Sequence, residues 1–282
     1  IQKTVTAKVE NSTITATGTV SVLANDKAES DSGTFGVGIG LGGNAGGAAI
    51  VGYSIADTVR AYADNSTLTS TAADVLVRAN GVYAMKTATV GGAGGSSIAI
   101  GGSIAIHVIS NDVRAYISGS GKQVKAHGSV AVEAHHELVM GMGAGGIGIG
   151  VGDVGAGIAN VTAIVDSKTK AWIGSGVLVT AFGNGNPISV YSGKVNQSNE
   201  SQTTSLSGVA VTATYTEDLT GVTIAGGGGA SGGGAGSATA SNLGSETNQS
   251  RCWRRPLPAL VKARDHLPLV APPGSGREST PP

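Results

Sequence analysis

The chain has 282 residues and a formal net charge of zero, and 47 of its residues are glycine, 4% are aromatic and 13% are charged. Glycine is more than twice as frequent as its usual share of roughly 7%, and the apolar residues are mainly Val, Ile and Ala, which argues against an ordinary globular core and favours closely stacked strands. A chain without excess positive charge also lacks the basic surface that binds nucleic acid, so we expect no nucleic-acid partner.

A basic–small–aromatic block marks a repeat of about 54 residues. The block Arg60-Ala61-Tyr62 returns as Arg114-Ala115-Tyr116 and as Lys170-Ala171-Trp172, and the central alanines lie 54 and then 56 positions apart. Ala7 lies a further 54 positions upstream, in a weaker copy. Self-similarity at a fixed period is typical of units that stack along one axis and bury their apolar faces against their neighbours. We therefore predict an all-β fold, a parallel β-solenoid (β-helix) built from these repeats.

The repeat divides the chain into successive units. The units are 1–32 (the end of one unit), 33–90, 91–142, 143–204 and a partial unit 205–245. Because the chain begins inside a unit and no signal peptide is visible at Ile1, we expect the native amino terminus to lie upstream.

Each unit contains stretches in which apolar residues alternate with glycine, such as Ile147, Ile149 and Val151. A period of two places these side chains on one face of a strand and bare glycine backbone on the other. A helix is excluded because each interior glycine would cost it about 1 kcal/mol relative to alanine. One repeat has room for about five or six ordinary strands, which predicts two or three solenoid turns per repeat. A β-sandwich of hairpins is the alternative. Tight hairpin turn signals are nearly missing from the sequence, however, and Asn80-Gly81 is the main exception.

Two glycine-rich segments resemble ligand-binding motifs but lack the features that complete them. Residues Gly38 to Gly43 match the pattern G-x-G-x-x-G, but no helix is predicted to follow, so we exclude a dinucleotide site. The run from Gly226 to Gly236 contains no aspartate, so the carboxylates of a calcium-binding repeat are missing. We predict no cofactor and no cofactor-binding residue.

Histidines offer the best candidates for a metal site. Glu133, His135 and Glu137 would share one face of a strand and could hold a divalent metal ion. The corresponding segment of the earlier unit has no such ligands, so we favour an exposed polar strand. His107 alternates with apolar residues, which indicates a half-buried packing residue. We predict no metal site.

Acidic, basic and aromatic residues each recur once per repeat near the marker block. The acids are Asp57, Asp112 and Asp166, the basic residues are Arg60, Arg114 and Lys170, and the aromatic residues are Tyr62, Tyr116 and Trp172. Evenly spaced acids predict a column that caps turns, because a catalytic site would break the repeat. The basic residues are expected to form exposed pairs with these acids, each worth about 0–1 kcal/mol. For the aromatic residues we favour inward packing over a carbohydrate-binding stripe, and we predict no catalytic residue and no enzyme.

The apolar segment 143–165 has nearly the length of a membrane span, but it contains Asp153 and Asn160 and is rich in glycine. We predict a buried pair of strands there and no membrane insertion. Residues 246–282 form a Pro/Arg-rich tail in which seven of the eight prolines lie, and proline cannot donate to a sheet. We expect this tail to be disordered or out of frame, with a genuine basic linker as the alternative. The only cysteine, Cys252, lies in it, which excludes a disulfide framework from the body.

The order of these segments resembles the repeats of very large bacterial filamentous adhesins, the leukotoxin-type and filamentous haemagglutinin-like surface proteins. The resemblance covers about residues 1–245 and is carried by Val113–Ile117 with Val130–Val132, and by Thr169–Ile173 with Ile188–Val190. It implies an exported β-solenoid shaft at the cell surface and brings no catalytic residues. The chain shows no secretion or anchoring module, so the route of export stays open.

These observations predict a non-enzymatic structural or adhesive shaft fragment of a secreted bacterial cell-surface adhesin. Its partners would be molecules on a host or neighbouring cell, glycans among them, and open strand edges also predict edge-to-edge self-association. The alternative is a β-helical protein that binds or cleaves polysaccharide, which would need acids that converge in one groove.

Overall fold

The computed structural model describes residues 1–251 apart from 198, 199 and 245. The tail beyond residue 251, with Cys252, lies outside the described residues. The described part consists of strands joined by turns and bends, without a helix, which confirms the predicted all-β class. It therefore contains no helix long and apolar enough to cross a membrane.

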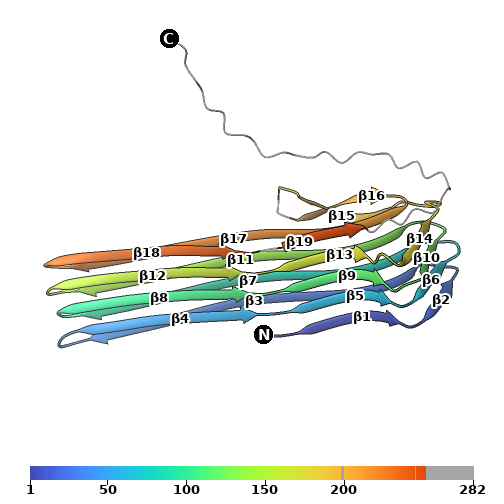
Figure 1. The fold of residues 1–282 in the computed structure, drawn as a ribbon. Coiled ribbons are helices and arrows are strands. Elements are labelled where there is room, and N and C mark those ends of the chain that lie inside the picture. Colours follow the sequence, from blue (N-terminus) through green and yellow to red (C-terminus); the bar gives the residue numbers. More distant parts are fainter. Residues whose placement is uncertain (198–199, 245, 252–282) are drawn as a thin grey trace, which may run out of the picture. The chain divides into compact units, whose positions relative to one another are not determined.

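Sixteen of the strands recur in a fixed order and form three sheets of four strands and most of a fourth, larger sheet (Figure 1). Sheet A contains β1 (Thr4–Glu10), β5 (Thr58–Asp64), β9 (Asp112–Ser118), β13 (Lys168–Ile173) and β19 (Glu246–Arg251). Sheet B contains β2 (Thr13–Ala16), β6 (Thr67–Ser70), β10 (Lys122–Ala126) and β14 (Val177–Ala181). Sheet C contains β3 (Val20–Gly40), β7 (Val75–Gly95), β11 (Val130–Gly150) and β17 (Val209–Gly229). Sheet D contains β4 (Ala45–Ile55), β8 (Ile98–Ile109), β12 (Val154–Val165) and β18 (Gly232–Leu243).

The chain passes once through sheets A, B, C and D before it returns to sheet A beside its previous strand. In sheet A, Ala7 pairs with Ala61, Ala61 with Ala115 and Ala115 with Ala171, all in parallel strands. The marker block is therefore in register across the copies. One repeat makes one circuit, whereas we predicted two or three, because each strand of sheet C has 21 residues, about four times the ordinary length.

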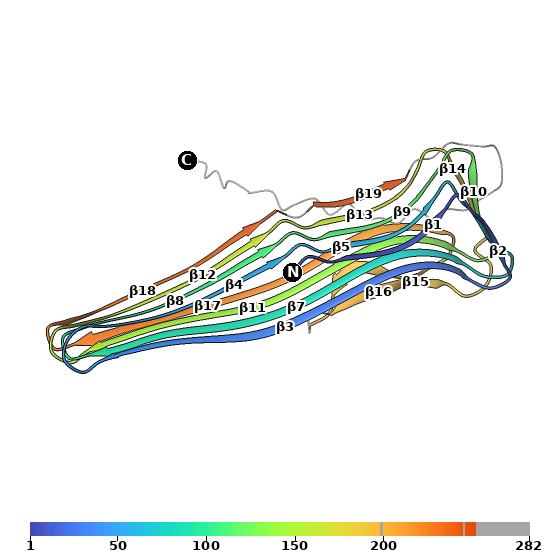
Figure 2. The same cartoon turned by 90° about the horizontal axis from the view of Figure 1, so that it is seen from below.

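One antiparallel hairpin interrupts the fourth circuit. It consists of β15 (Ile188–Val195) and β16 (Ser201–Leu206) and lies between β14 and β17 in the chain. Figure 2 shows it on the side of sheet C that faces away from sheet D. The hairpin alternative is thus limited to this one pair among the described strands. The remainder of the segment 205–245 forms the full-length strands β17 and β18, and pairing continues through β19 to residue 251.

Asparagine turns the chain from sheet A into sheet B. Asn11 and Asn65 have positive φ angles of 50° and 47°, which asparagine tolerates better than most residues. The side-chain amide of Asn65 donates to Oδ1 of Asn11 over 2.6 Å. In the third circuit Gly119, with φ of 124°, lies at this corner. The small polar residues between the strands therefore define the corner.

The interior contains two apolar clusters. The first lies among sheets A, B and C and includes Val59, Leu68 and Val77, and the second lies between sheets C and D and includes Leu138 and Val161. All five of these side chains are buried. Their columns continue from circuit to circuit, so each copy covers the core of the next.

At the turn between sheets C and D the interior is filled by glycine backbone. A Cβ atom on Gly36 would overlap the carbonyl of Ala48, and one on Gly146 would overlap the backbone of Ile158. We call this the glycine-rich end: residues 33–50 and their register partners in later circuits. Because the glycines face inward, Ile147 and Ile149 face outward and are exposed. The predicted strand pair in 143–165 is present, but the prediction that it is buried is wrong for these outward side chains.

Candidate functional site

The aromatic residues of the marker block form a stacked column on the outer face of sheet A. The rings of Tyr62 and Tyr116 lie 4.8 Å apart at 2°, and those of Tyr116 and Trp172 lie 4.3 Å apart at 6°. The predicted inward packing is wrong, because the alanine between each basic and aromatic residue takes the inward position. Each ring covers the face of its neighbour, so the column offers mainly ring edges rather than the open faces on which sugars stack.

The predicted column of acids does not form. Asp112 lies beside Thr58 in the register, and the backbone N–H of Asp57 instead donates to Oδ1 of Asn111 in the next circuit over 3.0 Å. Asp57 is buried, and burial, followed by the charge of Asp26, raises the pKa of its carboxyl. The spacing explains this, because Asp57 and Asp112 are 55 positions apart while the register step here is 54.

The basic column does form, and it pairs with two acids: Lys170 lies 3.3 Å from Glu246, and the two arginines share Asp112. Arg60, Arg114 and Lys170 lie in register on sheet A. Asp112 lies 2.6 Å from Nε of Arg114 and 3.6 Å from a guanidinium nitrogen of Arg60. These pairs are partly exposed, as predicted, and contribute about 0–1 kcal/mol each.

Two histidines point into the interior. His107 is fully buried, bonds Oγ1 of Thr87 through Nε2 over 2.6 Å and stacks on Tyr53. It is a packing residue, as predicted, although it is more deeply buried than we expected. His136 is also buried and packs edge-on against Tyr83. Burial lowers the pKa of His107, and it lowers the pKa of His136 to about 3.

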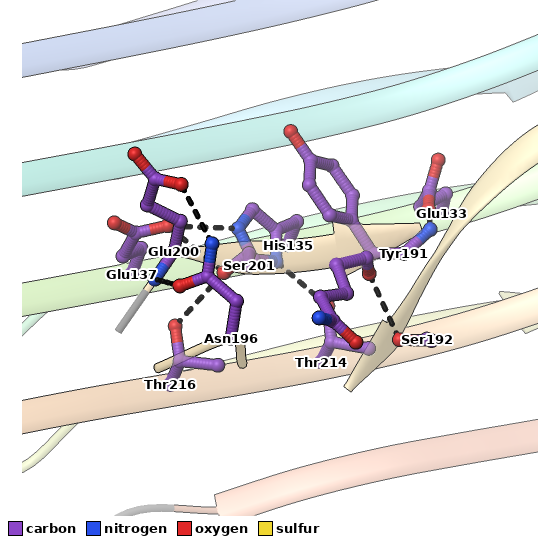
Figure 3. Close-up of polar contacts among 11 residues, drawn as sticks. Glu133, His135, Glu137, Tyr191, Ser192, Asn196, Glu200, Ser201, Thr214 and Thr216 are labelled. Carbon is purple, nitrogen blue, oxygen red and sulfur yellow. Dashed lines mark hydrogen bonds and ion pairs between the residues drawn. The ribbon is translucent and has the colours of Figure 1, made fainter. Parts of the chain in front are cut away.

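The most elaborate polar cluster surrounds Glu133, His135 and Glu137, which share the outer face of β11 as the sequence predicts (Figure 3). The expectation that this strand is exposed is wrong, because the hairpin β15–β16 covers it. Glu133 and His135 are 0% and 1% exposed. The sequence gives no sign of this cover, since the hairpin has no counterpart in the earlier circuits.

Glu133 connects the sheet to the hairpin. Its Oε2 lies 2.5 Å from Nε of Arg78 on the adjacent strand β7, and its Oε1 accepts a hydrogen bond from the backbone N–H of Tyr191 on β15. Arg78 also donates to the carbonyl of Ser189 over 2.8 Å. Each carboxylate oxygen of Glu133 thus lies against a polar partner, and the register of the repeat places Arg78 beside Glu133.

His135 lies between two polar partners and an aromatic cover. Its Nδ1 is 2.8 Å from Oγ1 of Thr214, its Nε2 is 3.6 Å from Oε2 of Glu137, and the ring of Tyr191 stacks on it at 3.6 Å. Burial lowers the pKa of His135 to about 4, although the charge of Glu137 acts in the opposite direction. The imidazole is therefore neutral at pH 7.

Hydroxyl, imidazole and carboxylate lie here in the order that a nucleophilic triad uses, but the geometry leaves no place for a substrate. Tyr191 covers the imidazole, and Thr214 is 6% exposed. The adjoining cavity, lined by Glu137, Gly193 and Thr216 among others, has a volume of about 170 Å³, below the roughly 300 Å³ at which ligand pockets begin. The cluster holds the hairpin in place.

The same contacts argue against a metal ion at this cluster. The carboxylate of Glu133 is already paired with Arg78, which leaves His135 and Glu137 as the available ligands. Nowhere in the described part of the chain do three or more His, Cys, Asp or Glu side chains gather as a metal site would require. The two glycine motifs lie within strands and their connections, and no helix follows Gly43.

The outer faces of the glycine-rich end expose several large apolar side chains. On sheet C, the exposed side chains include Phe35, Val37 and Ile39, and on sheet D they include Ile50 and Ile158. Phe35 and Ile39 are 79% and 75% exposed. Large exposed apolar patches mark interaction sites. The alternation of Ile with Gly was visible in the sequence, but the inward position of the glycines was not.

No protein-family model, curated protein sequence or solved structure matches this chain.

Proposed function

We propose that this chain is a shaft fragment of a secreted bacterial cell-surface adhesin, in which the circuits form a parallel β-solenoid and the exposed faces serve as a contact surface. The observation that carries the proposal is the in-register stacking of four successive circuits, with Tyr62, Tyr116 and Trp172 as its outer column. Repetition of this kind extends a surface along one axis. It places the aromatic residues of three successive circuits side by side on the outer face of sheet A.

The mechanism is mechanical and multivalent. Backbone hydrogen bonds between circuits provide the shaft, and weak contacts along the outer faces add together because one bound circuit raises the effective concentration of the next. The partners are molecules on a host or neighbouring cell, glycans among them. No enzymatic role is part of the proposal, because the recurring acids do not converge and the His135 cluster is closed.

A polysaccharide-binding role has one observation in its favour. A shallow depression of about 750 Å³ lies over sheet C, where Lys86, Asp31 and Asp218 adjoin small residues such as Gly141. It is open and lined by one sheet, so it resembles a contact surface more than a catalytic groove. Binding of glycans there would be consistent with adhesion.

The test is attachment of beads coated with the full chain to cultured epithelial cells and to bacterial cells. Attachment should rise steeply with coating density, while the soluble chain should compete weakly. Beads coated with the heat-denatured chain are the control. Failure to attach at every density, or release of oligosaccharides from a polysaccharide panel, would contradict an adhesive shaft. Antibody labelling of intact cells of the source organism tests the location.

A further inference from the structure

Sheet D has an uncharged outer surface. The four strands β4, β8, β12 and β18 contain no Asp, Glu, Lys or Arg. Their one histidine, His107, points into the core. An antiparallel or mixed sheet that faces water normally carries polar side chains on that face, and sheets apolar on both faces are normally covered on both. The outer face of sheet D therefore lacks the features of a surface that stays in water.

Branched apolar side chains dominate the middle of this face. On β8 the outward residues Ile98, Ile100, Ile104, Ile106 and Val108 are all exposed. The polar side chains of the neighbouring strand β12 are partly satisfied, because the hydroxyl of Thr162 donates to Oδ1 of Asn160 over 3.0 Å. Unlike sheet C, which carries charges such as Lys86 and Asp218 along its length, sheet D is uncharged from the glycine-rich end to sheet A.

The outward isoleucine and valine side chains of sheet D cannot turn inward. The positions between them on β8 and β12, Ala105, Ala159 and Ala163 among them, are buried against sheet C. A slip of one residue would exchange the two faces, and near the glycine-rich end the inner face has no space for a Cβ atom at Gly101 or Gly157. The exposure of the isoleucines is thus a consequence of the close approach of sheets C and D.

The outer face of sheet D has the surface shape expected of a sheet that packs against its own copy. Ile158 lies beside Gly102 in the register, and Ile106 lies beside Gly52. Bulky side chains therefore alternate with positions that have no side chain, so the ridges of one copy can enter the notches of another. Two sheets that pack face to face in this way lie about 10 Å apart, with strand directions within about 30°.

The area of the outer face of sheet D also fits that of a stable dimer interface. Four strands of about 12 residues cover about 40 Å by 19 Å, or roughly 750 Å², at the usual rise and spacing of strands. A stable protein–protein interface buries about 800 Å² on each partner. A charged macromolecule gains nothing from a face without charges, whereas the same apolar patch on both partners is what a two-fold interface requires.

We propose that the outer face of sheet D packs against the same face of a second copy of this chain and forms a closed, two-fold dimer. The association is face to face, distinct from pairing at strand edges, and it does not depend on the adhesive role.

The experiment is analytical ultracentrifugation of the full chain from about 0.1 to 100 µM, with the variant Ile104→Lys at the centre of β8. The wild-type chain should be a dimer, and Ile104→Lys should raise the dimer dissociation constant at least about 100-fold while circular dichroism is unchanged. The matched control is Ile147→Lys on sheet C, where the same residue type is 48% exposed against 37% for Ile104. It should leave the dimer intact. Ile104→Thr provides a milder second variant, should the lysine disturb folding.

Several results would overturn the proposal. A wild-type chain that is monomeric at 100 µM would do so, and flotation of that monomer with neutral phosphatidylcholine vesicles would identify lipid as the occupant instead. Open-ended polymers that persist in Ile104→Lys would indicate edge-to-edge pairing. Dissociation by Ile147→Lys alone would assign the contact to sheet C.

Discussion

At the scale of single residues, Glu133 has the clearest role, because one carboxylate bonds two elements that the repeat does not join. It pairs with Arg78 of sheet C and accepts from the N–H of Tyr191 in the hairpin. Removal of Glu133 would leave the guanidinium of Arg78 without its partner, and because Arg78 is 30% exposed the cost should lie below the roughly 3–5 kcal/mol of a fully buried pair.

We therefore expect Glu133→Ala to release the hairpin locally while the circuits stay folded. Amide hydrogen exchange at Tyr191 should become at least about 100-fold faster, and exchange in β7 should change little. Glu29→Ala is the control, because the Glu29–Lys27 pair is largely exposed and such pairs contribute little. Unchanged exchange at Tyr191 would show that Glu133 does not hold the hairpin.

The buried histidines predict a dependence of stability on pH. The pKa values of His135 and His136 are lowered to about 4 and about 3, while an unfolded histidine titrates near 6.5. Between these values the unfolded chain binds more protons, so the free energy of unfolding should fall by a few kcal/mol as the pH decreases from about 6.5 to about 4. Asp57, with its raised pKa, acts in the opposite sense near the acidic end.

Urea denaturation at pH 7, 5.5 and 4.5 measures this slope. His135→Gln keeps a polar side chain beside Thr214 but cannot titrate, so its stability should depend less on pH than that of the wild-type chain. An equal slope in both proteins would exclude His135 as a source.

At the scale of the elements, the length of the repeat could be predicted from the sequence, but which face of each strand is buried could not. The alanines at 61, 115 and 171 gave the register of sheet A, since a repeated buried position reports its own spacing. The predicted number of strands per repeat is wrong, because nothing in the alternation of residues in β3 indicates that this strand continues for 21 residues. The prediction that the strands of the glycine-rich end are buried is wrong for a related reason. A period of two identifies two faces of a strand but does not tell which one is buried.

The close approach at the glycine-rich end leaves no room for a side chain at inward glycines such as Gly146. Gly146→Ala would place a Cβ atom against the backbone of Ile158, and backbone cannot move aside as a side chain can, so we expect a loss of about 3 kcal/mol in the free energy of unfolding. Gly94→Ala is the matched control, since a Cβ atom there meets no atom within 4 Å. Thermal denaturation should separate the two variants, and similar melting temperatures would contradict inward glycines.

The hairpin shows where prediction from a repeat reaches its limit. The repeat placed Glu133, His135 and Glu137 on one face correctly, because that follows from strand geometry. Their burial depends on β15 and β16, which occur once and therefore have no period. Tyr191, the residue that covers His135, had no counterpart to identify it.

At the scale of the whole described assembly, stability should be a sum over circuits and their contacts with neighbours. Deletion of residues 58–111 removes one complete circuit, because Thr58 and Asp112 occupy the same register position. Asp57 would then lead directly into β9, and the first and third circuits would face each other with alanine against alanine in sheet A.

We expect this deletion to yield a folded β protein with a melting temperature lowered by several degrees, because one interface between circuits and the Arg78–Glu133 pair are lost while every remaining strand of sheets A to D keeps a parallel partner. Deletion of residues 58–84 removes half a circuit and displaces β8 from its register with β4, so the same measurement should find no cooperative transition. Far-ultraviolet circular dichroism and limited proteolysis distinguish the two outcomes. If the whole-circuit deletion unfolds as completely as the half-circuit deletion, the circuits are not interchangeable, and contacts that occur once, such as those of the hairpin, must hold the fold together.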